Sequence, residues 1–119
     1  MSPDAFCEAM MAAIVRTVTA YYGKGGAGYG RASVGRIGLK RESISATIAR
    51  REGLNPRGIG QALRISTRRV TADAERMERA TLSDAALATD LRAIHSQLWE
   101  AVHAAAGAAI VGATVRSAA

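Results

Sequence analysis

The segment NPRGIGQALRISTRRVTADAERM, residues 55–77, decides the fold that we expect for this chain. Asn55 is a favoured helix N-cap and Pro56 suits the first helical position, so a short helix is predicted to run from Pro56 to about Leu63. Ser66 is a second N-cap, which opens the next helix. Two helices joined by so brief a turn form a candidate helix-turn-helix.

Small and apolar residues occupy the positions that a helix-turn-helix requires. Gly60 lies where the first helix meets the second, and a side chain there would hold the two helices apart. The apolar positions around it are also filled, by Ile59, Leu63, Ile65 and Val70. Arg64 replaces the usual turn glycine, and Asp73 stands where an apolar residue is expected, with Ala74 as its substitute. The pattern alone leaves an ordinary helical corner as the alternative.

Positive charge is concentrated in the middle of the chain. The 119 residues carry a net charge of +6, but residues 24–69 hold eleven Lys or Arg against two Glu, and the remainder sums to −3. Such a distribution is typical of a polyanion-binding protein. In a helix-turn-helix the second helix faces base edges and the start of the first touches phosphate. We therefore expect DNA contacts from Arg57, Ser66, Thr67, Arg68, Arg69 and Thr71. The alternative is a generally arginine-rich surface, since the chain has fourteen Arg and two Lys.

The remaining pattern predicts an all-α fold of five to six helices with a long C-terminal helix. Residues 2–22 form one predicted helix, with an apolar stripe of Phe6, Met10, Ile14, Val18 and Tyr21. A helix over about 41–52 carries Ile44 and Ile48, and the helix after Ser66 extends to about Ala80. Ser83 and Asp84 cap a last helix with apolar residues at Leu87, Leu91, Ile94, Leu98 and Val102. We expect one DNA-binding domain over 1–106 and a small-residue tail over 107–119.

The order and spacing of these features resemble a known family. IVRTVTAYY at 14–22, a basic loop, the helix with Ile44 and Ile48, and GIGQAL at 58–63 are similar to the C-terminal box-binding domain of the bacterial replication initiator DnaA. The resemblance covers roughly residues 12–98. It implies a helix-turn-helix of the Trp repressor type, whose basic loop places arginine in the minor groove.

The resemblance assigns that minor-groove role to Arg36 and Lys40. Residues Ser66 to Arg69 precede Val70 where the family has Asp-His-Thr-Thr. The chain has neither a P-loop nor an ATPase domain, so we expect a stand-alone double-stranded DNA-binding module in replication or transcription control.

Catalytic and cofactor functions find little support in the sequence. GKGGAG at 23–28 spells a dinucleotide fingerprint, but a helix precedes it instead of a strand, so we expect a hinge and no bound nucleotide. His95 and His103 are two turns apart with no partner at metal-ligand spacing. We therefore expect no enzyme activity, no metal and no cofactor.

The chain is expected to be soluble and cytoplasmic, associated with the nucleoid. It has a single cysteine, and its longest weakly polar run, residues 104–115, is too short to span a bilayer. The alternative function is that of a non-enzymatic interaction or structural protein. In that case the C-terminal helix around Trp99, with its small residues, would form a homodimer.

Overall fold

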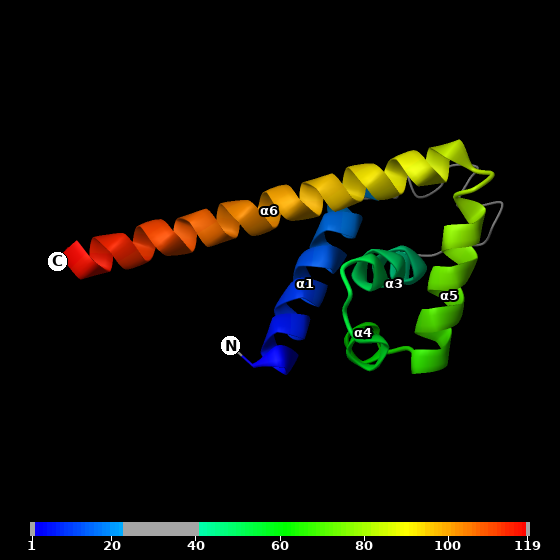
Figure 1. Ribbon diagram of the computed structural model, residues 1–119, viewed down its shortest axis with the longest axis horizontal. Coiled ribbons are helices and arrows are strands. Elements are labelled where there is room, and N and C mark those ends of the chain that lie inside the picture. The colour runs from blue at the N-terminus through cyan, green and yellow to red at the C-terminus, as the bar shows by residue number, and fades with distance from the viewer. Residues whose placement is uncertain (1, 23–40, 119) are drawn as a thin grey trace.

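The computed structural model describes the backbone of residues 2–22 and 41–118, and the side chains of these residues as far as Gly107. Every regular element in these ranges is an α-helix (Figure 1). They are α1 (Pro3–Tyr22), α3 (Arg41–Arg51), α4 (Pro56–Leu63), α5 (Thr67–Ala80) and α6 (Ala85–Ala118). The predicted all-α fold of five to six helices is confirmed.

Helix α3 forms the centre of the core. It contacts all four of the other helices named above, and its residues 43–49 are all buried. Ile44 and Ile48 are fully buried, as the sequence predicted. The buried hydroxyl of Thr47 donates a hydrogen bond to the carbonyl oxygen of Ser43 at 2.8 Å, so that burial does not leave it without a partner.

The buried face of α1 differs from the predicted stripe at both ends. Met10, Ile14 and Val18 are buried as expected, but Phe6 is 51% exposed and Tyr22 is buried in place of Tyr21. A row of residues spaced by four rotates by about 40° per step around a helix of 3.6 residues per turn. A stripe of that spacing therefore leaves the core at its ends.

The first half of α6 covers α1 and α3. Asp84 caps α6, because its Oδ1 accepts a hydrogen bond from the backbone N–H of Leu87 at 3.0 Å. The predicted apolar stripe is buried at Leu87, Leu91, Ile94 and Leu98. The carboxylate of Asp90 accepts hydrogen bonds from Tyr21 Oη at 2.7 Å and Tyr22 Oη at 3.3 Å, which tie the end of α1 to α6.

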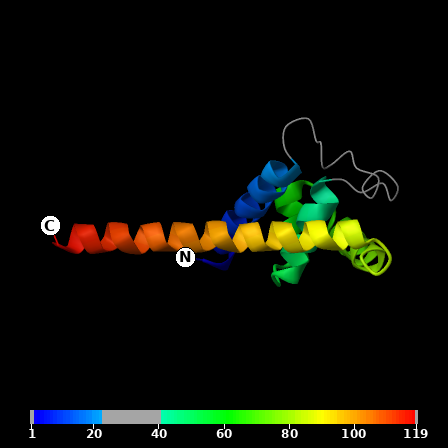
Figure 2. The same ribbon diagram turned by 90° about the horizontal axis from the view of Figure 1, so that it is seen from above.

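Helix α6 is much longer than the core that it covers. Its 34 residues span about 50 Å at 1.5 Å per residue, close to the 56 Å longest dimension of the molecule. Figures 1 and 2 show its C-terminal half extending past the other helices. The helix passes through Gly107 without a break, so the role of 107–119 as a separate tail stays a prediction. None of the helices described has the length and apolar content needed to cross a membrane.

Candidate nucleic-acid interface

Helices α4 and α5 cross closely at Gly60. A methyl group at this position would lie 2.7 Å from the backbone carbonyl oxygen of Ile65, which is shorter than real contacts of this kind. Ile59 and Val70 are fully buried beside the crossing, and Leu63 and Ile65 pack against the same core. The five residues predicted to form the helix-turn-helix crossing thus all lie at it.

Arg64 adopts the backbone conformation for which the turn glycine is usually required. Its φ of 59° and ψ of 43° are left-handed, and it is the one residue other than glycine with positive φ in the part of the chain that the structure describes. Its backbone N–H and that of Ile65 both donate to the carbonyl oxygen of Gly60. For an L-residue this conformation costs about 1–2 kcal/mol. The turn thus has the usual backbone conformation, with an exposed arginine side chain in place of glycine.

Side-chain caps begin both helices of the segment. Asn55 Oδ1 accepts a hydrogen bond from the backbone N–H of Arg57 at 2.8 Å. Ser66 Oγ accepts one from the backbone N–H of Arg69 at 3.1 Å. Both helices begin where the sequence predicted. The hydroxyl proton of Ser66 remains able to donate to a ligand, so capping leaves this predicted contact residue one polar function.

The predicted contact residues of α4 and α5 are exposed, as is Arg64 in the turn between these helices. Arg57, Arg64 and Arg68 form no hydrogen bond or ion pair through their side chains with any described residue. The stretch from residue 53 to residue 72 contains four arginines and no carboxylate. The exposed hydroxyl of Thr71 donates to the carbonyl oxygen of Thr67 at a long 3.4 Å. In Figure 1, α4 and the N-terminal end of α5 lie at the end of the molecule away from α6.

Arg69 differs from its neighbour Arg68, because its guanidinium is paired within the protein. Its Nε lies 3.3 Å from Asp73 Oδ2, one helical turn further along α5. The side chain of Asp73 is only 10% exposed and also accepts hydrogen bonds from Arg76 at 3.3 Å and from Ser43 Oγ at 2.9 Å. Asp73 therefore holds α5 against α3 and restrains Arg69 at the same time.

The apolar residue expected at this point is thus replaced by a buried polar junction, next to a buried Ala74. Sequence reasoning missed the junction, because Ser43 lies thirty residues from Asp73 along the chain. The donors that make burial of the Asp73 carboxylate possible are supplied by Ser43 on α3 and by the two adjacent turns of α5.

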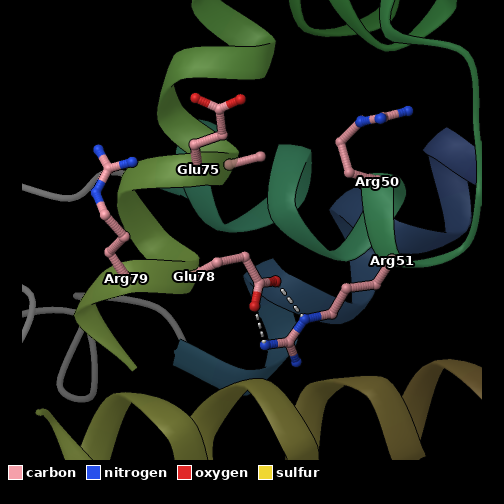
Figure 3. A pocket seen from close by; sticks show the side chains of 6 residues that line it. Arg50, Arg51, Glu75, Glu78 and Arg79 are labelled. Carbon is pink, nitrogen blue, oxygen red and sulfur yellow. Dashed lines mark hydrogen bonds and ion pairs between the residues drawn. The ribbon is translucent and has the colours of Figure 1, made fainter. Parts of the chain in front are cut away.

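A second ion pair joins α3 to α5 further from the turn. Arg51 Nε and Nη2 bind Glu78 Oε1 and Oε2 at 2.6 Å and 3.0 Å, in a two-pronged geometry (Figure 3). An open groove runs beside this pair and is lined by Arg50, Arg51, Ala74, Glu75, Glu78 and Arg79. Both partners are partly exposed, so the pair sets the orientation of α5 more than it adds stability.

The histidines do not assemble a metal site among the described residues. His95 Nε2 is hydrogen-bonded to Glu52 Oε1, and Trp99 Nε1 donates to the same oxygen at 2.9 Å. No group of three or more His, Cys, Asp or Glu residues in the described ranges is placed to hold a metal ion. Sequence spacing missed the partner of His95, because Glu52 lies 43 residues earlier, in the turn that follows α3. The cluster connects α6 to the C-terminal end of α3.

Part of the predicted interface cannot be placed. Arg36, Lys40 and the GKGGAG segment lie outside the described residues, between the end of α1 and the start of α3. The predicted minor-groove contacts therefore stay predictions. Compared with known proteins, the chain matches no family model, no curated protein and no solved structure.

Proposed function

We propose that this protein binds double-stranded DNA through α4, the turn at residues 64–66 and the first turns of α5. The observation that carries the proposal is a closely crossed helix pair that presents Arg57, Arg64 and Arg68, all exposed and without partners among the described residues. A helix-turn-helix places its second helix in the major groove and the start of its first helix at phosphate. The absence of carboxylates from residues 53–72 favours approach to a polyanion.

The residues divide by the contact that their position favours. Arg57 lies in the first turn of α4 and Arg64 caps its C-terminal end, and both suit phosphate oxygens. Arg68 lies in the first turn of α5 and suits a guanine edge. Ser66, Thr67 and Thr71 supply short hydroxyls beside it, and Arg69 acts mainly by its pair with Asp73. Arg36 and Lys40 remain proposed contacts through the resemblance to DnaA alone.

The biological role that fits this proposal is control of replication or transcription by a stand-alone module. The resemblance of the sequence to the box-binding domain of DnaA supports it. The proposal assigns no catalytic step, cofactor or nucleotide to the chain, and it places the protein on the nucleoid in the cytoplasm.

Fluorescence anisotropy with labelled duplexes tests the proposal. Binding to a random duplex and to a duplex with a DnaA-type box is measured at several salt concentrations. We expect affinity to fall steeply with salt, and Arg57→Ala to reduce the log-log slope by about 0.9, the contribution of one phosphate contact.

Arg92→Ala is the matched control, since it removes the same charge from an exposed position on α6. The slope of this variant should equal that of the wild type. Absence of salt-sensitive binding to both duplexes at low salt would overturn the proposal.

A second candidate function is self-association through α6. It is favoured by the extension of α6 for about four turns beyond Val102, the last of its described side chains that packs against the core. Trp99 is 40% exposed on the same helix. Light scattering coupled to size-exclusion chromatography distinguishes the two functions, because apolar self-association would persist at high salt while DNA binding would not.

A further inference from the structure

The outward face of α5 carries a carboxylate, Glu75, that forms no hydrogen bond or ion pair with any described residue. Residues of α5 that point into the core are Val70, Asp73, Ala74 and Met77. The positions opposite to them, at spacings of four, three and four, are Arg68, Ala72, Glu75 and Arg79, and all four are exposed. One carboxylate thus lies on the same outward face as Arg68, two helical turns further along α5, at the edge of the groove lined by Arg50 and Arg51.

Glu75 has no partner among the described residues, in contrast to the other acidic residues of α5. Asp73 binds Ser43 and Arg69, and Glu78 binds Arg51 through two contacts. Figure 3 shows Glu78 joined to Arg51 by two dashed lines, whereas none joins Glu75 to Arg50 or Arg79 nearby. Within the part of the chain that the structure describes, no ion pair of Glu75 therefore explains a negative charge at this place.

A carboxylate on a DNA-facing helix has a specific chemical use. It repels phosphate, so it weakens binding to DNA in general. At the floor of the major groove it can accept a hydrogen bond from the exocyclic amino group of cytosine. Arg68, two turns before Glu75, can donate to guanine, and the methyl group of Ala72 between them can contact thymine.

The spacing of Arg68 and Glu75 fits this arrangement. Seven residues of helix rise about 10.5 Å, and three base-pair steps cover about 10.2 Å along the duplex. We infer that Glu75 is a specificity-determining residue that accepts a hydrogen bond from cytosine about three base pairs from the guanine bound by Arg68. This inference rests on the proposed DNA-binding function.

The experiment is selection of bound duplexes from a library with a randomised core, followed by sequencing, for the wild type and for Glu75→Gln. The wild type should select cytosine at one position. Because glutamine pairs best with adenine, the variant should replace that preference by adenine and disfavour cytosine by at least about fivefold. Arg68→Ala should abolish the guanine preference about three base pairs away.

Glu78→Gln is the matched control, since it removes the same charge from the same helix but from the side that contacts Arg51. It should leave base preference unchanged, and circular dichroism at 222 nm should show equal helicity for all variants. Wild-type selection without any preference, or equal preferences for Glu75→Gln and the wild type, would overturn the role of Glu75 while leaving DNA binding intact. No recovery of any duplex would overturn the proposed function and this inference together.

Discussion

Replacing Gly60 by alanine tests the close crossing of α4 and α5 on which the helix-turn-helix depends. The added methyl group would lie 2.7 Å from the carbonyl oxygen of Ile65 and 3.5 Å from the backbone nitrogen of Thr67. Both atoms belong to the backbone of the turn. That backbone is itself held by hydrogen bonds from Arg64 and Ile65 to the carbonyl oxygen of Gly60, so it cannot move without weakening them.

The magnitude follows from two opposing contributions. Alanine in a helix interior is about 1 kcal/mol more favourable than glycine. Forcing a methyl group into a close-packed contact costs about 1–3 kcal/mol, with the upper end expected where backbone must shift. We therefore expect Gly60→Ala to lower the free energy of unfolding by about 1–2 kcal/mol, even though the substitution improves helix propensity.

Urea unfolding followed by ellipticity at 222 nm and by the fluorescence of Trp99, the single tryptophan, measures this difference. Gly58→Ala is the matched control two residues away, because the added methyl group would contact a side chain and not the backbone. It would lie 2.8 Å from the Sγ atom of Cys7, which is partly buried. Combining it with Cys7→Ala should therefore cost less than the sum of the two single substitutions. A Gly60→Ala protein as stable as the wild type would refute the argument from close crossing.

Three further predictions concern the turn between α4 and α5, the first turn of α5, and the contact between α1 and α6. Arg64→Gly should raise the free energy of unfolding by about 0.5–1 kcal/mol, because glycine adopts positive φ without strain, and anisotropy titrations should show a salt slope smaller by about 0.9. Arg68→Ala should weaken DNA binding by about 1–3 kcal/mol, whereas Arg69→Ala should weaken it less and lower the unfolding midpoint in urea, because Asp73 loses a partner. Equal losses of affinity in these two variants would contradict the division of roles. Asp90→Ala should destabilise the fold by about 1–2 kcal/mol in thermal melts, since Tyr21 and Tyr22 lose an acceptor, and an unchanged midpoint would exclude that contribution.

Local signals in the sequence were sufficient to place the helix-turn-helix. Asn55 with Pro56 and Ser66 cap their helices through bonds to residues two or three positions away, so their effect is visible in any short window. The role of Gly60 at the crossing of α4 and α5 was also predictable, because two helices that cross so closely require a small residue. The first residues of α4 and α5 could therefore be predicted, because the side chains that cap these helices bond to residues close by in the sequence.

Contacts between distant residues could not be predicted in the same way. Asp73 was expected to be a defect in an apolar pattern, and only the tertiary fold brings Ser43 to it. Glu52 meets His95 across 43 residues for the same reason. The left-handed conformation of Arg64 was not predicted, because an arginine side chain gives no signal for positive φ. The position of Arg64 in the turn, where glycine is usual, was the one available signal.

The helical period explains how two adjacent arginines of α5 come to have different expected roles. Consecutive residues point about 100° apart around the helix axis, so Arg68 lies on the outward face while Arg69 lies toward Asp73. The pair with Asp73 stabilises the helix on α3 but leaves Arg69 with less freedom to contact DNA. Affinity for DNA should therefore depend on Arg68, whereas the angle at which α5 presents Arg68 should depend on Arg69 through Asp73. If the proposed DNA binding holds, loss of the buried carboxylate should disturb base preference, even though Asp73 lies on the buried face of α5.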